Sequence, residues 1–386
     1  MIFNAAEPAG VPVGPGAGIV RGPKLGSRRD EARALPALLD ESNVPDPHPA
    51  TINAVAASSQ APADRAIAMP LMIAGAGRRF RASRGARMCR MQPREEPMTP
   101  EELTAEVLES FAGCADERLR ELMQALVRHA HGLIREVGLT PAEWEQAIQV
   151  LTRTGHITDD RRQEFILWSD SLGLSMLVDA IEHTLPAGAT ESTVLGPFYV
   201  AGSPVREYGA DIAQEAAGVP ALVHGRVLGL DGAAIVGAEL DVWQNGDDRL
   251  YAVQRPEAPE DHLRGRFITR EDASYAFLAV RPVPYPIPYD GPVGRMLEAT
   301  GRHPWRPAHI HMIVRAEGYQ TLTTHVFDAA SDYLESDAVF AVKPSLVREF
   351  IEHRVGDPDA PAGVQGDWVS VRNDIVLAPA AEPRRS

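Results

Sequence analysis

The chain has 386 residues, a formal net charge of -15 at pH 7 and two cysteines. Its length allows two or three domains. The acidic balance argues against nucleic acid and an anionic membrane surface as main partners, because both attract basic patches. Cys89 and Cys114 provide neither a disulfide framework nor a cysteine-based zinc site. The low cysteine content suits a reducing cytoplasm, where we expect the protein. No stretch approaches the roughly 20 apolar residues of a membrane span.

Residues 1–97 are rich in Ala, Pro, Gly and Arg and follow neither a helical nor a strand period. Such a composition buries too little apolar surface to offset the entropy lost on ordering, so we predict a disordered N-terminal extension. A transit peptide is an alternative that the acidic residues within this region disfavour. A start codon assigned too early is another, because Met88, Met91 and Met98 all precede the first structural signal.

Capping boxes mark the start of two helices. Thr99 is followed by Pro100 and, three positions on from the threonine, by Glu102, and Thr140 repeats this pattern. Apolar residues then recur at helical spacing, so residues 98–215 are expected to form a helical domain and a connecting loop. The segments predicted to be helical are 99–112, 116–137, 140–153, 158–173 and 174–185.

From Pro220 onward the apolar period falls from about 3.6 residues to 2. Turn residues separate the resulting short strands, as at Leu230-Asp231-Gly232. Regularly spaced short strands predict an antiparallel β-sandwich over residues 216–378, followed by a flexible tail at 379–386. Strands are expected at 221–228, 238–244, 266–269, 275–280, 309–314, 320–327 and 368–377, and a last helix at 345–353.

The most informative segment is RPAHIH at residues 306–311. Side chains two apart in a strand point to the same face, so His309 and His311 can reach one metal ion while Ile310 points to the opposite layer. Such a pair can serve zinc, copper or iron, and it also occurs on ordinary polar strand faces. The residues around the pair must therefore distinguish these interpretations.

Two tyrosines stand in settings that favour a metal site. Tyr285 lies in the run PVPYPIP, whose prolines stiffen the loop and fix the direction of the side chain. Tyr251 follows a predicted strand end and a polar turn, and phenolate is a hard, anionic donor that suits Fe(III). Tyr289 competes with Tyr285 on the same loop, and either ring also fits ordinary packing. His325, on the next strand, fits a polar residue beside the site.

These motifs resemble the intradiol ring-cleavage dioxygenases, which hold Fe(III) with two tyrosines and two histidines. The resemblance covers residues 99–377 and rests on TVLGPFY at 193–199, on DVW at 241–243 and on GRH before RPAHIH. It implies an α+β fold, with an N-terminal helical dimerisation domain, a β-sandwich catalytic domain and one Fe(III) per subunit. The family spacing from tyrosine to histidine selects Tyr285 rather than Tyr289. The implied iron ligands are Tyr251, Tyr285, His309 and His311.

Within the family, the proline-rich loop and DGPVG at residues 290–294 are similar to hydroxyquinol 1,2-dioxygenases. The resemblance implies that Arg306 stabilises negative charge on the substrate and that Tyr285 leaves the metal and takes up protons of the diol. His325 would assist, and Asp170 would accept a hydrogen bond from the third hydroxyl group of the substrate. The implied substrate-binding residues are Leu167, Asp170, Val194, Leu195, Gly196 and Val339.

The implied function is Fe(III)-dependent intradiol cleavage of hydroxyquinol by O2, to 3-hydroxy-cis,cis-muconate or maleylacetate, in the catabolism of aromatic compounds. The resemblance also implies a homodimer formed through the helical domain and a lipid bound between its helices. The alternatives are a catechol or chlorocatechol 1,2-dioxygenase, a zinc hydrolase built on the two histidines and a non-catalytic sandwich binding module. A red-brown colour would separate an iron-tyrosinate protein from the last two.

Overall fold

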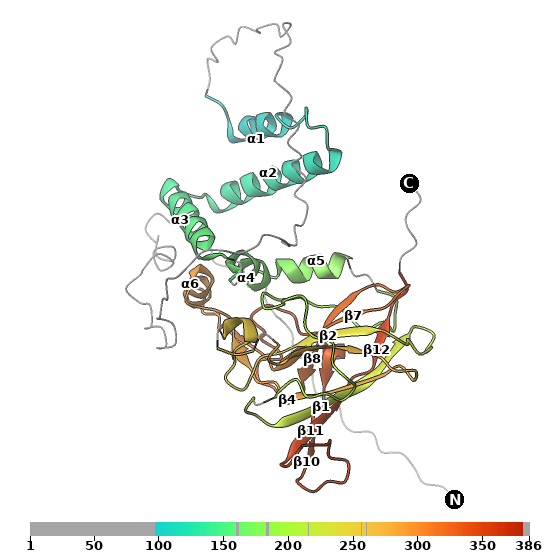
Figure 1. The fold of residues 1–386 in the computed structure, drawn as a ribbon. Helices are drawn as coiled ribbons and strands as arrows, with labels where there is room; N and C mark the ends of the chain where they lie inside the picture. Colours follow the sequence, from blue (N-terminus) through green and yellow to red (C-terminus); the bar gives the residue numbers. More distant parts are fainter. Residues whose placement is uncertain are drawn as a thin grey trace, which may run out of the picture.

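The computed structural model describes residues 97–159, 162–182, 185–214, 216–255, 257–259 and 261–380. The predicted N-terminal extension lies almost wholly outside these residues, as does most of the predicted tail, so both remain predictions. Figure 1 shows helices in the first part of the described chain and strands in the second. This order confirms the predicted α+β fold class.

The helices begin where their capping residues stand. The Thr99 hydroxyl accepts a hydrogen bond from the Glu102 backbone, the Glu102 side chain accepts one in return, and Thr140 repeats the arrangement. The Thr158 hydroxyl bonds back to the carbonyl of Thr154, which completes the end of α3 instead of starting the next helix as predicted. The helices are α1 (Pro100–Glu109), α2 (Glu117–Val137), α3 (Pro141–Ile157), α4 (Glu164–Ser171) and α5 (Leu174–Glu182).

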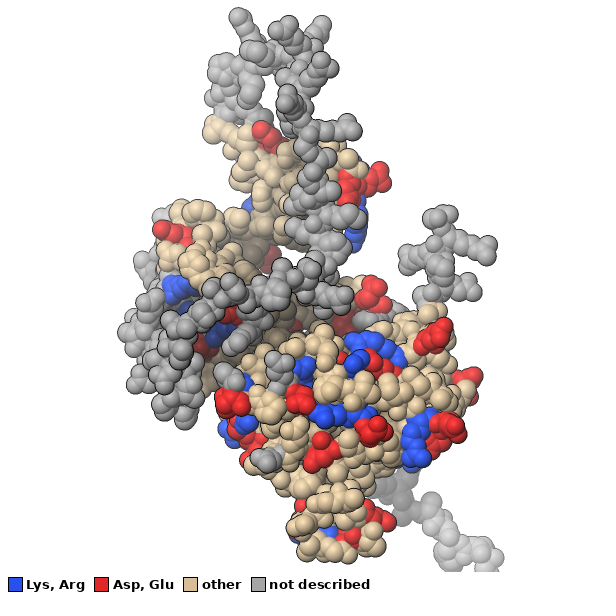
Figure 2. All heavy atoms as spheres, in the orientation of Figure 1, with Lys and Arg blue, Asp and Glu red and all other residues tan. Residues whose placement is uncertain are grey.

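Helices α1 to α3 form an arm that stands away from the sandwich, whereas α4 and α5 lie against it (Figure 1). Neither α1 nor α2 has a buried residue. No helix in the described part of the chain is long and apolar enough to cross a membrane. Figure 2 shows acidic and basic side chains interspersed over the visible face of the sandwich. Large apolar side chains are exposed along α2 at Leu119, Leu122, Leu126, Leu133, Ile134 and Val137.

Two five-stranded sheets form the sandwich. One has the order β10-β11-β1-β12, with β4 also paired to β1, and the other has the order β3-β2-β7-β8-β9. Most pairs are antiparallel as predicted, but β1 runs parallel to β11 and β12, and β8 to β9. The longer strands are β1 (Pro220–Gly229), β2 (Glu239–Trp243), β3 (Arg264–Ile268), β4 (Ser274–Val280), β7 (His309–Arg315), β8 (Leu322–Asp328) and β11 (Trp368–Arg372). The shorter ones are β5 (Tyr285–Pro286), β6 (Trp305–Arg306), β9 (Val347–Arg348), β10 (Ile351–His353) and β12 (Ile375–Leu377).

One predicted helix needs correction, and one helix was missed. The helix expected at residues 345–353 is wrong, because a short 3-10 turn (Pro344–Leu346) leads there into β9 and β10. Those two strands extend the sheet edges of β8 and β11, and such pairing outweighs the local helical spacing. Helix α6 (Pro292–Ala299) was not predicted, although Pro292 at its first position is a helix-start signal.

Strand β7 separates the core from the face that carries the histidines. Ile310, Met312 and Val314 belong to the apolar core between the two sheets. Ile313, on the alternate face, packs in a second buried cluster that includes Leu167 of α4. The period of two along β7 thus directs the histidines away from the core and toward the helices.

Candidate metal centre and pocket

Three rings stand side by side across the sheet on this second face. Trp243 of β2 is the register partner of His311, and His311 is the register partner of His325 on β8. His309 lies two residues before His311 and is paired with Phe327. The sheet therefore holds three histidines at neighbouring positions on rigid strands.

Donor atoms from two of these histidines and from Tyr251 converge. The Nε2 atoms of His309 and His311 are 3.1 Å apart, and the Tyr251 hydroxyl is 3.0 Å from Nε2 of His311. His309 Nδ1 donates to the Pro307 carbonyl at 2.7 Å, because a carbonyl can only accept. The neutral His309 ring therefore presents the lone pair of Nε2 toward the other donors, the arrangement common among metal-bound histidines.

Tyr285 enters the same cluster from the ladder of β5 and β6. It is the register partner of Arg306, whose Nη1 donates to the Tyr285 hydroxyl at 3.2 Å. Its ring centroid lies 5.2 Å from that of Tyr251 and 5.5 Å from that of His309. Tyr289 is 53% exposed, against 2% for Tyr285. Of the two tyrosines on this loop, Tyr285 is the one that contacts the donor cluster.

Burial sets the protonation of these groups. It lowers the pKa of His309, His311 and His325 well below the ordinary value, so all three rings are neutral, the form that binds metals. Burial, together with the neighbouring Tyr285, raises the pKa of Tyr251 well above the ordinary value of a phenol. A Tyr251 phenolate therefore needs a bound cation to stabilise it.

This donor set fits a metal ion. His311 Nδ1 is buried and makes no hydrogen bond with any described residue, which is uncommon for a buried polar atom, whereas the His325 ring interacts with the backbone of Val194. The ligand atoms of His309, His311 and His325 lie within 4.8 Å of one another. Three histidines alone would suit zinc as well as iron. The two buried phenol groups beside them favour a hard, highly charged ion such as Fe(III).

Apolar walls surround the donor cluster. Leu167 of α4, Val194 and Val339 all belong to the buried cluster that contains Tyr251 and Tyr285. Three distant parts of the sequence therefore meet in this cluster, and their role in lining a substrate pocket stays a prediction.

Gly196 approaches the histidines closely. Its φ is +77°, and a Cβ atom at this position would lie 3.4 Å from Cε1 of His311. Both the backbone conformation and the limited space favour glycine. Leu195 is 42% exposed. It is the predicted apolar wall residue that lies outside the buried cluster.

Asp170 is buried on α4 and not solvated. Burial raises the pKa of its carboxyl group, and a hydrogen bond from Ser175 and the charge of Arg306 partly offset that rise. The same balance includes the charge of Asp337, which raises the pKa. Asp170 is therefore a buried acid within the field of Arg306.

Three residues of the site were not assigned from the sequence. Phe198 stacks on Tyr251 with ring centroids 4.6 Å apart, and Trp243 stacks on His311 at 4.7 Å. Both stand inside motifs already singled out, so an aromatic residue next to a ligand motif was an available signal. Asp337, whose Oδ1 accepts from Nε of Arg306 at 3.1 Å, belongs to no motif.

Known proteins that are similar to this chain are dioxygenases. Residues 194–379 match the family model described as "Dioxygenase", and residues 116–190 match "Catechol dioxygenase N terminus". The hydroxyquinol 1,2-dioxygenase of Nocardioides simplex is 49% identical over 288 residues, which cover 74% of this chain and 98% of that protein. The structure of hydroxyquinol 1,2-dioxygenase from Pseudomonas putida DLL-E4 matches with a TM-score of 0.68 at 45% identity, covering 73% of this chain and 99% of the other. Catechol 1,2-dioxygenase from Pseudomonas arvilla C-1 matches with a TM-score of 0.66 at 27% identity, covering 74% and 94%.

Proposed function

The chain belongs to the intradiol ring-cleavage dioxygenases, and from this premise we propose that it cleaves hydroxyquinol with O2. Hydroxyquinol is benzene-1,2,4-triol, and cleavage between its two adjacent hydroxyl groups gives 3-hydroxy-cis,cis-muconate or its tautomer maleylacetate. The observation that supports this substrate is the buried Asp170 on α4, the helix that also carries Leu167 of the apolar cluster around Tyr251 and Tyr285. The similarity to hydroxyquinol 1,2-dioxygenases supports the same choice.

Asp170 would distinguish a triol from a diol. Its carboxylate can accept a hydrogen bond from the third hydroxyl group, which catechol lacks. Binding catechol would leave this buried acceptor without a partner, at a cost of about 1–3 kcal/mol. A purely apolar wall would discriminate only weakly between the two rings.

Proteins of this family depend on iron. We propose that Tyr251, Tyr285, His309 and His311 hold one Fe(III) per subunit. Their converging oxygen and nitrogen atoms and the neutral state of the histidines support this assignment. The chemistry that bound Fe(III) supplies is Lewis acidity toward the two diol oxygens, which makes the ring reactive toward O2.

The remaining steps fall to side chains of this chain. Tyr285 takes up a proton of the diol at its phenol oxygen, and Arg306 holds that oxygen through its hydrogen bond. The Arg306 charge also stabilises negative charge that develops on the substrate. His325 supplies a neutral hydrogen-bond donor beside His311, since the centroids of the two imidazole rings are 4.1 Å apart. Leu167 and Val339 exclude water from the pocket.

We propose that two copies of the chain pair through the helical arm. The exposed apolar side chains of α2 support this, because contiguous apolar surface of this kind usually marks an interaction site. A lipid between these helices and cytoplasmic localisation stay predictions from the sequence.

The decisive experiment is an aerobic assay of the iron-loaded protein with hydroxyquinol and catechol side by side. We expect a red-brown protein with a higher kcat/KM for hydroxyquinol. Asp170→Ala should lower kcat/KM more for hydroxyquinol than for catechol and so reduce the preference by about 1–3 kcal/mol. Equal losses for both substrates would show that Asp170 only supports the fold. A wild-type preference for catechol would overturn the hydroxyquinol assignment.

A further inference from the structure

Asp337 is a buried carboxylate that accepts four hydrogen bonds from three residues. It accepts from Nε and Nη2 of Arg306, at 3.1 and 3.4 Å. It also accepts from the backbone N–H groups of Val339 at 3.3 Å and Ala341 at 3.0 Å. One carboxylate thus joins the arginine of the site to the chain segment that carries the pocket wall residue Val339.

The Arg306 guanidinium is 2% exposed, so its charge has lost nearly all contact with water. Burial disfavours this charge, but the adjacent Asp337 carboxylate, together with Tyr285 and Tyr251, more than offsets that effect and keeps the pKa of Arg306 above its ordinary value. Because two hydrogen bonds to the carboxylate fix the plane of the guanidinium, Nη1 is directed at the Tyr285 hydroxyl.

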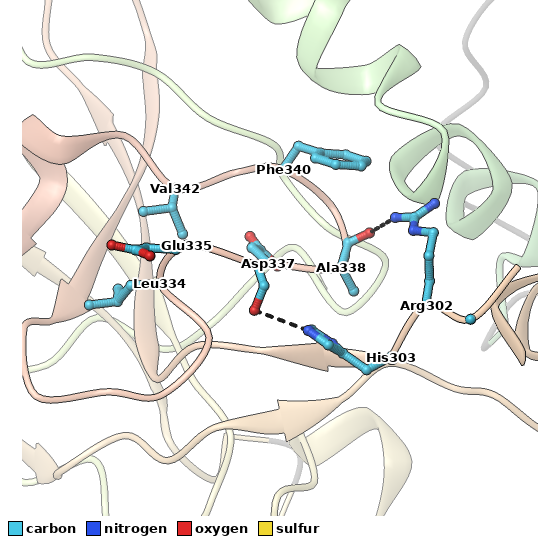
Figure 3. Close-up of a pocket in the computed structure, with 10 residues that line it drawn as sticks. Arg302, His303, Leu334, Glu335, Asp337, Ala338, Phe340 and Val342 are labelled. Carbon is cyan, nitrogen blue, oxygen red and sulfur yellow. Dashed lines mark hydrogen bonds between the residues drawn. The ribbon is translucent and has the colours of Figure 1, made fainter. Parts of the chain in front are cut away.

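The same segment, residues 334–342, is also held from its outer side. Figure 3 shows this side, where Arg302 reaches the Ala338 carbonyl, 2.9 Å away, beside a cavity of about 480 Å³. The other guanidinium nitrogen of Arg302 donates to the carbonyl of Ser171 at the end of α4. Both bonds of Arg302 go to backbone carbonyls, and its guanidinium also lies over the Phe340 ring, 5.0 Å from the centroid, so Arg302 holds the segment from outside.

We propose that Asp337 is a positioning residue of the ring-cleavage reaction: it orients Arg306 against Tyr285 and couples that charge to the pocket wall at Val339. The proposal rests on the function proposed above. In it, Asp337 acts through Arg306 and touches neither substrate nor metal ligand. Its removal leaves a buried positive charge without a fixed direction, so the guanidinium no longer meets the developing negative charge of the substrate in one geometry.

The test compares Asp337→Asn, which keeps the shape and removes the charge, with Asp337→Glu, which keeps the charge and displaces it. We expect kcat to fall about 10- to 100-fold in Asp337→Asn, less than the loss typical of removing a donor itself. Asp337→Glu should lose activity in the same direction while it retains more of the thermal stability. A second readout is the affinity for 4-nitrocatechol, whose colour changes when its hydroxyl groups ionise on binding; we expect weaker binding in both variants.

Asp328→Asn is the matched control. Asp328 is also buried, accepts from Nε of Arg281 at 2.7 Å and from the N–H of Ala330, and its side chain bonds to neither Arg306 nor a proposed iron ligand. This variant should lose thermal stability and keep its kcat and its affinity for 4-nitrocatechol. If Asp337→Asn behaves in the same way, Asp337 only stabilises the fold and the proposal is wrong.

A double-mutant cycle with Arg306→Gln tests the route of action. If Asp337 acts through Arg306, adding Asp337→Asn to Arg306→Gln should cost no further activity or analogue affinity. A further loss in the double variant would overturn the positioning role. Failure of the proposed function gives a different result. The iron-loaded, coloured wild-type protein would then cleave neither hydroxyquinol nor catechol, whereas the affinity for 4-nitrocatechol would still show whether Asp337 positions Arg306.

Discussion

At the scale of single residues, the site combines groups whose burial is unfavourable without a partner. Nδ1 of His311 lacks a hydrogen bond to any described residue, and burial holds Tyr251 in its neutral form. Each unsatisfied buried polar group costs about 1–3 kcal/mol. Unfavourable buried groups of this kind are typical of ligand-binding sites. The proposed Fe(III) would stabilise the phenolate form of Tyr251.

Replacing Tyr251 with Phe tests the oxygen ligands. Removal of the phenol oxygen should weaken or shift the visible absorption band and lower the iron retained after dialysis, because only the hydroxyl is lost from the buried ring. Tyr289→Phe is the control, since Tyr289 is 53% exposed on the loop of Tyr285. An unchanged spectrum and iron content in Tyr251→Phe would remove it from the ligand set.

The buried acid Asp170 predicts a pH dependence of stability. Its folded pKa lies above the ordinary value of 3.8, so its contribution is most favourable below that value and is lost as pH rises through the folded pKa. Asp170→Asn has no carboxyl group to titrate, so the variant does not lose this stability as pH rises. The free energy of unfolding of the variant, relative to wild type, should therefore increase from acid to neutral pH in urea denaturation series. If the difference in unfolding free energy between variant and wild type is constant with pH, the pKa of Asp170 is not raised in the folded protein.

At the scale of elements, α4 and α6 support the loop that presents Tyr285. The Glu164 carboxylate, buried at the start of α4, accepts from the backbone N–H of Val293 in the first turn of α6. Gly294, also in that turn, packs directly against the backbone of Tyr289. These contacts place the Tyr285 loop relative to α4, which also carries Asp170.

Gly294→Ala should disturb this arrangement. A Cβ atom there would lie 1.7 Å from the Tyr289 carbonyl oxygen, so the loop or α6 has to move. We expect the free energy of unfolding to fall by about 1–3 kcal/mol, with a parallel loss of bound iron. Gly155→Ala on α3 is the control: nothing lies within 4 Å of its Cβ position, and alanine should stabilise the helix by about 0.5–1 kcal/mol. Equal effects of the two changes on iron binding would refute the role of α6.

At the scale of the whole molecule, helices α1 and α2 of the arm have no core of their own. No residue of α1 or α2 is buried, and apolar side chains line α2 on its exposed surface. A second copy of the chain could bury this surface and stabilise the arm by roughly 25 cal/mol per Å² of apolar area. The catalytic site lies on the sandwich and α4, so pairing and iron binding should be separable.

Leu126→Glu tests this separation. Leu126 is 60% exposed on α2, and a charge there would oppose burial against a partner. We expect a shift from dimer to monomer in analytical ultracentrifugation, with the visible band of the iron site retained. Arg128→Glu, also an exposed position on α2 but two residues away and thus on another helix face, should leave the dimer intact. A wild-type chain that is monomeric at all concentrations would disprove the pairing.

Interactions between residues close in the sequence determined two helix starts and the orientation of the two histidines proposed as iron ligands. Capping boxes at Thr99 and Thr140 located two helix starts, and the period of two around His309 and His311 turned both rings to one face, because these rules depend only on near neighbours in the chain. The nature of the donors, imidazole and phenol, already indicated a metal, and the motifs around them indicated the family.

Contacts between distant segments were decided by the tertiary structure alone. The segment at residues 345–353 forms two edge strands because its backbone pairs with β8 and β11. This pairing depends on distant segments and cannot be inferred from residues 345–353 alone. Likewise, the parallel pairing of β1 with β11 joins segments about 150 residues apart, beyond the reach of turn signals. Asp337 meets Arg306 across 31 residues with no motif to announce it. The proposed role of Asp337 depends on burial, because a buried ion pair holds the Arg306 guanidinium in one orientation. Burial is a property of the folded chain.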